Sequence, residues 1–238
     1  MPLNRSKSEK SRQHHAAGIF HVQKERGWCY FCGEPATSKE HVPPKCLFPE
    51  SERINLITVR SCDKHNSKKS GEDEFLRNYL MCKVGNNQTG IDLAGEKGKR
   101  SLELTKFKAL KETMEVHSVT QTDKGIFYTG RALEAGQNKA LHCLEHIIKG
   151  LLYHETGKRY DGGATVIPTW FTHSPFNEAE LKPVFDLIKR EESSQNWKGN
   201  NPAVFKYFLR KETPEWKPIL SMVFYENSRV HVILHESL

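Results

Sequence analysis

Two close pairs of potential metal ligands constrain what the first part of this chain can fold into. Cys29 and Cys32 form a Cys-x-x-Cys pair, Cys62 and His65 form a Cys-x-x-His pair, and residues 33–61 lie between the pairs. Each pair can supply two adjacent corners of a tetrahedron from one tight turn, which is the arrangement of structural zinc sites. We therefore predict that Cys29, Cys32, Cys62 and His65 bind a structural zinc ion that clamps the intervening segment.

The other cysteines are Cys46, Cys82 and Cys143, which brings the total to 6. The N-terminus has no apolar stretch of the kind that a secretory signal needs, so a disulfide framework is not expected. Cys46 could replace His65 as the fourth zinc ligand, but no second ligand stands close to it in the sequence. Cys82 and Cys143 lie in apolar helical patterns, where we expect them to be small buried hydrophobic side chains.

The chain is basic, with 36 Lys and Arg against 29 Asp and Glu and a formal net charge of +7. Such an excess favours a polyanionic partner, and nucleic acid is the commonest one because Lys and Arg release counterions from its phosphates. A hydrophobic fraction of 37% is enough for a packed core, and no apolar run is long enough to cross a bilayer. These features favour a cytoplasmic protein that binds nucleic acid and has no membrane partner.

The residues enclosed by the two ligand pairs point to chemistry as well as to binding. Glu40 and His41 place a carboxylate, which can hold a hard divalent cation, beside an imidazole that can act as a general base near neutral pH. Asn66 directly follows the last predicted zinc ligand, so the metal would fix its position at the start of a helix. Asn55 falls on a predicted strand between the pairs, from which it could orient the imidazole.

At these residues the sequence resembles the HNH endonuclease family in its zinc-knuckle form. The matching positions come in the family's order and span about residues 27–82; they are Cys29 and Cys32, Glu40-His41, Asn55-Leu56, Cys62 and His65, and Asn66. The resemblance implies a ββα-metal fold in which a hairpin and a helix enclose one catalytic divalent ion. It also implies a hydrolase that cleaves nucleic acid, with DNA the expected substrate, in roles such as restriction, phage defence, homing or repair.

The resemblance assigns a role to each of the enclosed residues. Glu40 and Asn66 would hold Mg²⁺ or Mn²⁺ together with the scissile phosphate, and His41 would deprotonate the attacking water. Asn55 would keep the loop or the imidazole in place. Lysines near the second ligand pair are candidate contacts to nucleic acid: Lys64, Lys68 and Lys69.

Two other functions compete with a nuclease. The first is a zinc-stabilised nucleic-acid-binding protein without catalysis. The second rests on His142, Glu145 and His146, which fit the H-x-x-E-H pattern of some zinc proteases. The surrounding leucines and isoleucines make this segment an ordinary amphipathic helix, and a protease would leave the cysteine pairs unexplained, so we prefer the nuclease.

The rest of the pattern indicates an α+β protein. We predict a basic flexible arm at 1–15, an HNH nuclease domain at 16–84, a glycine-containing linker region at 85–114 and a C-terminal α+β domain at 115–238, with a mostly antiparallel sheet. The predicted strands are 36–42, 53–60, 115–121, 126–130, 203–210, 219–225 and 229–235. One predicted helix begins at residue 63, and the others run over 101–113, 132–156 and 177–192. The C-terminal domain could recognise DNA, form a homodimer or bind a regulatory partner.

Overall fold

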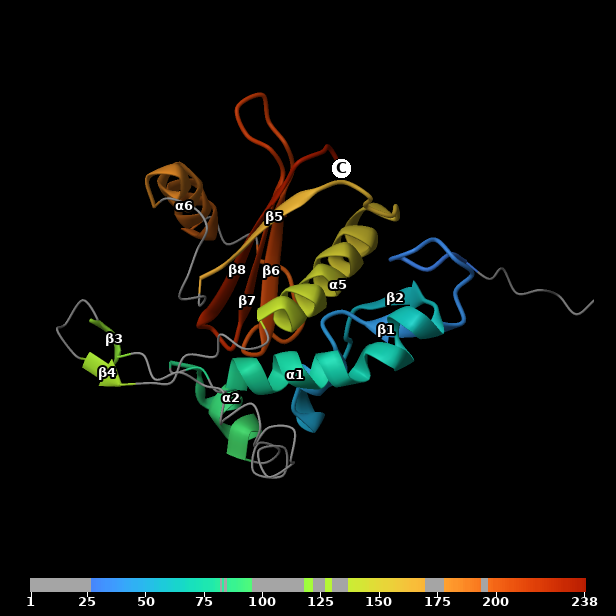
Figure 1. The fold of residues 1–238 in the computed structure, drawn as a ribbon, viewed down its shortest axis with the longest axis horizontal. Coiled ribbons are helices and arrows are strands. Elements are labelled where there is room, and N and C mark those ends of the chain that lie inside the picture. The colour runs from blue at the N-terminus through green and yellow to red at the C-terminus, as the bar shows by residue number, and fades with distance from the viewer. Residues whose placement is uncertain are drawn as a thin grey trace, which may run out of the picture.

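The computed structural model describes residues 27–81, 83, 85–95, 118–121, 127–129, 137–169, 178–193 and 197–238. The predicted arm at 1–15, the first residues of the predicted nuclease domain and the predicted helix at 101–113 lie outside the described residues. The described part is an α+β structure, as predicted. An N-terminal two-stranded hairpin with helices lies beside a C-terminal four-stranded antiparallel sheet with helices (Figure 1).

The N-terminal hairpin consists of β1 (Ser38–His41) and β2 (Thr58–Ser61), which pair antiparallel with Glu40 opposite Val59. Two short 3-10 helices, η1 (Lys45–Leu47) and η2 (Glu50–Glu52), occupy the connection. The second strand begins later than predicted, because Asn55 has a positive φ of 52° that interrupts an extended chain. The segment around Asn55 is therefore a turn and not a strand.

Helical structure after β2 begins with two 3-10 turns, η3 (Asp63–His65) and η4 (Ser67–Lys69), before α1 (Ser70–Met81). Helix α2 (Gln88–Leu93) follows inside the segment predicted as a linker. Asn87 caps α2 and ties it to the C-terminal sheet, because its side chain accepts a hydrogen bond from Gly90 N and donates one to Ala203 O. This part of the predicted linker is thus a docked helix.

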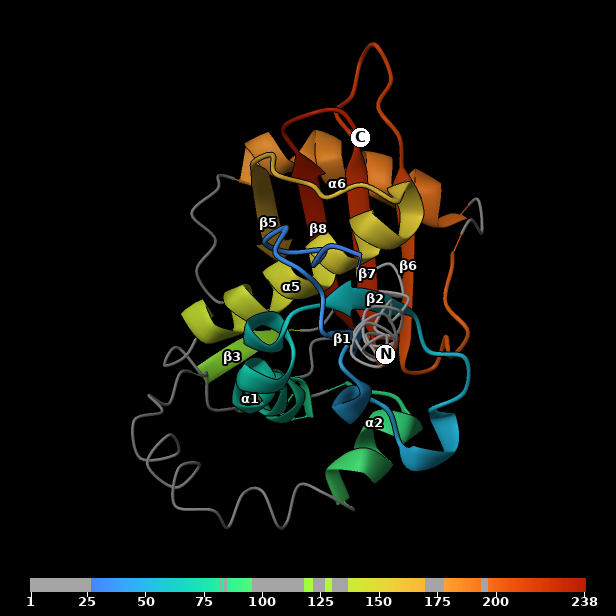
Figure 2. The ribbon, with the colours of Figure 1, turned by 90° about the vertical axis from the view of Figure 1, so that its right-hand side faces the viewer.

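In the C-terminal part, the described residues form a small hairpin, two helices and a sheet of strand order β5-β8-β7-β6, in which every neighbouring pair is antiparallel. Helices α5 and α6 cover opposite faces of this sheet (Figures 1 and 2). Strand β5 was not predicted, whereas the other elements lie close to their predicted ranges. The elements are β3 (Ser118–Gln121), β4 (Phe127–Thr129), α5 (Gln137–Thr156), β5 (Ala164–Pro168), α6 (Glu178–Ser193), β6 (Phe205–Arg210), β7 (Ile219–Phe224) and β8 (Ser228–Leu234).

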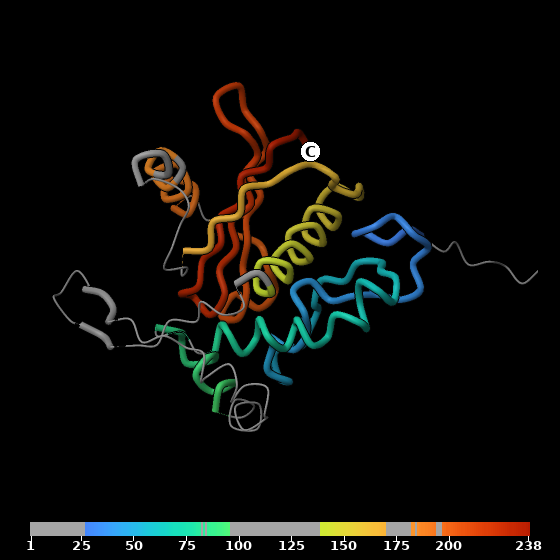
Figure 3. Tube along the Cα trace, viewed as in Figure 1, coloured from blue at the N-terminus to red at the C-terminus, as the bar shows by residue number. Residues whose placement is uncertain are grey.

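One hydrophobic core joins the two parts. Helix α5 lies between the sheet and the N-terminal hairpin with α1, as the chain trace shows (Figure 3). The same buried cluster includes Tyr30 from the first ligand pair, Leu76 from α1, Leu151 from α5 and Val232 from β8. No helix among the described residues combines the length and apolar character that a membrane crossing requires. The predicted nuclease segment therefore completes its core with residues from the C-terminal part.

Candidate metal centre and catalytic cavity

The four predicted zinc ligands converge on one point. The ligand atoms of Cys29, Cys32, Cys62 and His65 all lie within 4.8 Å of one another. Cys32 Sγ is 3.8 Å from Cys62 Sγ, and His65 Nδ1 is 3.3 Å from Cys62 Sγ and 3.8 Å from Cys29 Sγ. Zinc–sulfur bonds of about 2.3 Å give a tetrahedral edge of ~3.8 Å, so these separations suit a structural zinc ion.

Short backbone contacts build the turn that carries the first ligand pair. Gly33 N donates to Cys29 O at 3.0 Å, and Cys29 N donates to Glu34 O at 2.8 Å. Gly33 has a φ of +74°, which a glycine adopts with little strain. The pKa of the Cys29 thiol is lowered overall. Burial acts to raise it, but backbone hydrogen bonds from Cys32, Cys62 and Phe31 have the larger combined effect. The fold therefore favours the thiolate that a metal requires.

Cys46 does not belong to this centre. Its Sγ donates weakly to Asp73 O at 3.5 Å, and burial raises the pKa of its thiol to about 11. The alternative with Cys46 as the fourth zinc ligand is therefore wrong. Cys143 is buried in the core, as predicted, and Cys82 lies outside the described residues.

Apart from the metal centre, a hollow of about 190 Å³ lies between the hairpin and the start of α1. Three of the residues predicted to be catalytic line it, namely Glu40, His41 and Asn66. The others that line it are Pro44, Lys45, Cys46, Ser67, Ser70 and Asp73. We call this hollow the catalytic cavity after these three residues, whose catalytic role is a prediction from the sequence. Glu40 and His41 come from strand β1 of the hairpin, and Asn66 directly follows His65 of the second ligand pair.

His41 is partly buried at the end of β1. Burial lowers the pKa of its imidazole, and the positive charges of Lys45 and Arg53 lower it further. The ring is thus mostly uncharged near neutral pH, which is the state that a general base needs. Lys45 and Arg53 thus act on the ring as nearby positive charges, and Arg53 also pairs with Glu50.

Glu40 is almost fully buried, with 4% of its surface exposed, and both of its carboxylate oxygens have polar partners. Its Oε1 forms an ion pair with Lys69, while its Oε2 accepts hydrogen bonds from Tyr30 at 3.0 Å and from Ser61 at 3.4 Å. Burial raises the pKa of Glu40 to about 7, against the opposing effects of Lys69 and Tyr30. Both the protonated and the ionised forms of Glu40 are therefore populated near neutral pH, and Lys69 and Tyr30 favour the ionised form.

Lys69 differs from the other two lysines predicted to contact nucleic acid. Lys64 and Lys68 are exposed, but Lys69 is buried between two carboxylates, with its Nζ 2.6 Å from Asp73 Oδ1 and in contact with Glu40. A buried ammonium in such a pair cannot reach a nucleic-acid backbone without leaving both partners. We therefore retain only Lys64 and Lys68 as candidate contacts.

Asn66 is anchored through its amide nitrogen. The Nδ2 donates to Ser38 Oγ at 2.8 Å and to the Lys39 carbonyl at 3.1 Å. Both acceptors lie on β1, next to Glu40 and His41. The side chain thus joins the second ligand pair to the hairpin, and its Oδ1 remains the part of the amide that can accept a ligand.

Asn55 does not line the catalytic cavity. It is exposed and lies in the turn before β2, where its carbonyl accepts a hydrogen bond of 2.6 Å from Asn200 Nδ2. It borders a separate small hollow together with Val42 and Pro43. No described contact joins the Asn55 side chain to His41, so its predicted role in orienting the imidazole finds no support from contacts.

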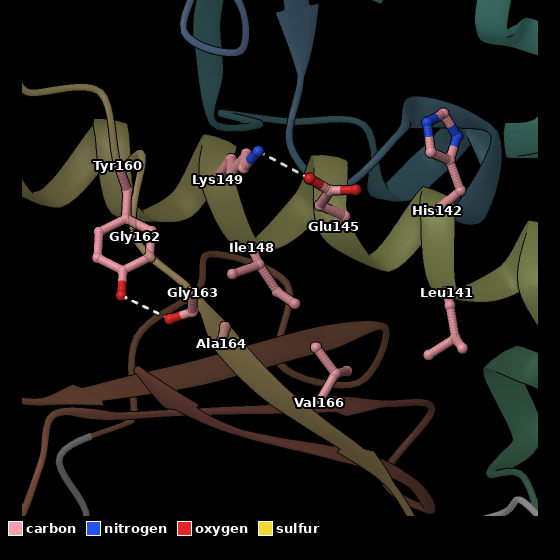
Figure 4. A pocket seen from close by; sticks show the side chains of 10 residues that line it. All are labelled: Leu141, His142, Glu145, Ile148, Lys149, Tyr160, Gly162, Gly163, Ala164 and Val166. Atoms are coloured by element: carbon pink, nitrogen blue, oxygen red, sulfur yellow. Dashed lines mark hydrogen bonds and ion pairs between the residues drawn. The ribbon is translucent and has the colours of Figure 1, made fainter. Parts of the chain in front are cut away.

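The H-x-x-E-H residues on α5 have separate partners. His142 Nδ1 pairs with Glu72 at 2.7 Å. Glu145 pairs with Lys149 at 2.7 Å, and a dashed line marks this second pair in Figure 4. His146 is buried and bonds to Tyr30 instead. The cavity of about 620 Å³ between α5 and β5 is lined by His142 and Glu145 but not by His146. Among the described residues, the one group of three or more His, Cys, Asp or Glu side chains that meets as a metal site is Cys29, Cys32, Cys62 and His65, so the protease hypothesis finds no geometric support.

Four residues of this region were not recognised, or were misassigned, from the sequence. Asp73 stands four residues after Lys69, a spacing at which charged side chains on a helix meet, so this pair carried a detectable signal. Tyr30 and His146 are separated by 116 positions, and no local pattern indicates that they meet.

Comparison of the chain with protein-family models, curated proteins and solved structures found no match.

Proposed function

We propose that this chain is a metal-dependent endonuclease of the HNH type that hydrolyses phosphodiester bonds, with DNA as its substrate. The observation that carries the proposal is the catalytic cavity, where Glu40, His41 and Asn66 line one hollow beside the Cys29–His65 centre. The order of these residues in the sequence matches that of the resembled family. Their meeting in one cavity is what a working site of this kind requires.

His41 is the proposed general base. Its lowered pKa leaves a neutral nitrogen that can take a proton from water, and Lys45 and Arg53 beside it favour the approach of a phosphate. Lys64 and Lys68 extend the positive surface along the 3-10 turns that precede α1. The net charge of +7 suits a polyanionic substrate.

The oxygen donors around the catalytic cavity suit a hard divalent ion. The carboxylates of Glu40 and Asp73 and the amide oxygen of Asn66 are the kinds of ligand that Mg²⁺ and Mn²⁺ prefer. When bound, such an ion would offset the negative charge that develops on the phosphate. Lys69 pairs with both carboxylates, so an entering ion would have to share them with its ammonium.

The contact with Lys69 is also the observation that favours the second candidate function. A lysine that permanently occupies both carboxylates would leave a zinc-stabilised nucleic-acid-binding protein without catalysis. The two functions agree on the zinc centre and on the positive surface. They differ in whether the catalytic cavity turns over a substrate.

Nicking of supercoiled plasmid by zinc-loaded protein, with Mg²⁺ or Mn²⁺ added, separates the two. We expect nicking by the wild type, and a loss of about 10²- to 10⁴-fold in rate for His41→Ala. His142→Ala is the matched control, since His142 is an exposed histidine outside the catalytic cavity, and we expect it to keep the wild-type rate. DNA binding without nicking in either ion would favour the second function, and nicking that survives His41→Ala would refute the role of His41.

A further inference from the structure

We propose that His146 of α5 is a positioning residue for the catalytic cavity, and that it acts through Tyr30 to fix the Glu40 carboxylate for a divalent ion. The consequence for catalysis rests on the proposed function. The contacts themselves, and the effect on ion binding, can be tested without it. The inference would make the C-terminal part of the chain a component of the nuclease site.

The hydrogen bonds define a chain with one direction. Tyr30 Oη donates to Glu40 Oε2 at 3.0 Å and lies 2.8 Å from His146 Nδ1. A tyrosine hydroxyl has a single proton, so if that proton goes to Glu40, the proton between Tyr30 and His146 must come from the imidazole. With the Tyr30 proton directed to Glu40, the imidazole of His146 carries a hydrogen on Nδ1, and we infer that the order of donation is His146 to Tyr30 to Glu40.

The three side chains are shielded from water, with exposed fractions of 2% for His146, 0% for Tyr30 and 4% for Glu40. In such a setting each group depends on its neighbour, because water cannot replace a lost partner. A change at His146 should therefore reach Glu40.

The imidazole of His146 is held in its plane by the zinc knuckle. The Phe31 ring stacks on it, with centroids 4.1 Å apart and an interplanar angle of 14°. The same Phe31 ring packs against the ligand His65 at 4.4 Å. The metal centre, the aromatic stack and the hydrogen-bond chain thus fix the ring from different sides.

The chain determines which oxygen of Glu40 is available. Tyr30 and Ser61 hold Oε2, and Oε1 contacts Lys69 at the catalytic cavity. Loss of the Tyr30 hydroxyl would leave Oε2 with only the longer bond from Ser61, and the carboxylate could rotate. Residues that orient a metal ligand in this way commonly change metal affinity by about 10- to 100-fold when they are replaced.

The test is Mn²⁺ binding to zinc-loaded protein, followed by electron paramagnetic resonance, with zinc content and melting temperature measured for every variant. We expect Tyr30→Phe and His146→Leu to raise the Mn²⁺ Kd by about tenfold or more. His146→Asn keeps an amide N–H close to the position of Nδ1 and should restore most of the affinity. His154→Leu, at an exposed position of the same helix, is the matched control and should leave the Kd unchanged.

A simple packing role for His146 predicts a different result, because His146→Asn would then bind Mn²⁺ no better than His146→Leu. That outcome would overturn the proposal, as would an absence of Mn²⁺ binding by the wild type. Long-range ¹H–¹⁵N spectra supply a second readout that needs neither ion nor substrate. They should show His146 with its proton on Nδ1, and a proton on Nε2 alone would refute the chain of donation.

The proposed nuclease function can fail separately. If the wild type binds Mn²⁺ and the variants shift its Kd as expected, but no protein nicks DNA, the positioning role stands and the endonuclease proposal falls. If DNA is nicked while Tyr30→Phe and His146→Leu retain the wild-type Mn²⁺ Kd, the endonuclease proposal stands and the positioning role falls.

Discussion

Replacement of Cys62 by serine removes one of the four ligand atoms of the proposed zinc centre and changes little else. Cys62 is only partly buried, and its Sγ lies 3.3 Å from His65 Nδ1 and 3.8 Å from Cys32 Sγ. A serine of similar size fills the same space, but its hydroxyl does not ionise at neutral pH as a ligand thiol does. The change in stability therefore reports mainly the loss of metal binding.

The size of the effect follows from the metal. Structural zinc contributes about 10–16 kcal/mol of binding free energy through four ligands, so one ligand accounts for ~3 kcal/mol. For a domain of this size, 1 kcal/mol shifts Tm by about 2–4 °C, and we expect Cys62→Ser to lower Tm by about 6–12 °C. Because the knuckle shares its core with α5 and the sheet, we expect one cooperative transition to move as a whole.

Differential scanning calorimetry, with zinc content measured on the same samples, provides the assay. Cys46→Ser is the matched control, since Cys46 is also partly buried but lies outside the metal centre. It should keep one zinc per chain and lose no more than about 1 kcal/mol. If Cys62→Ser retains a full zinc complement and melts with Cys46→Ser, the assignment of the four ligands is wrong.

Two further predictions concern pH and the knuckle turn. Burial lowers the pKa of His231 to about 4 from an ordinary value of 6.5, so the fold binds fewer protons than the unfolded chain and loses stability as the pH falls through this range. Urea denaturation should show a loss of about 2–3 kcal/mol between pH 7 and pH 4.5 that is absent in His231→Gln, and equal pH dependence in both proteins would contradict the prediction. Gly33→Ala forces a Cβ into a left-handed turn against Arg159, and we expect it to lower the free energy of unfolding by about 1–2 kcal/mol and to speed zinc release to a chromogenic chelator. The control is Gly71→Ala, which has open space in α1 and should be neutral or stabilising. Equal rates of zinc release from the two variants would show that the turn is not strained.

The metal centre was predictable from the sequence because its information is local. Two ligands on one turn must lie close together, so the sequence alone places Cys29 beside Cys32 and Cys62 beside His65. The fold has only to bring these two pairs together. Asn66 directly follows His65, so its position is fixed by the second pair. The meeting of Glu40, His41 and Asn66 in one cavity follows from the same constraint.

The orientation of Lys69 was not predictable from a simple helical pattern. The chain from Asp63 to Lys69 forms two 3-10 turns, which hold about three residues per turn and not the 3.6 of an α-helix. A pattern counted as one continuous helix therefore loses phase before α1 begins. Lys69 consequently turns inward onto Glu40 and Asp73, where an exposed lysine was expected.

The contacts of Asn55, β5 and His146 were beyond sequence reasoning for other reasons. Asn55 adopts a positive φ in a turn that resembled the start of a strand. Strand β5 is short and ends in Pro168, a residue that strands tolerate only at a sheet edge, where β5 indeed lies. His146 meets Tyr30 only after the whole chain has folded, so a regular helical pattern concealed its role.

The position of β8 in the sheet has a consequence for the living cell. Strand β8 (Ser228–Leu234) pairs with both β5 and β7, although it is made after them. During translation Cys29, Cys32, Cys62 and His65 are made before the C-terminal sheet, but the sheet that supports α5 cannot close until β8 has emerged from the ribosome. Because α5 carries His146, the proposed hydrogen bonds from His146 through Tyr30 to Glu40 can form only after β8 has been made.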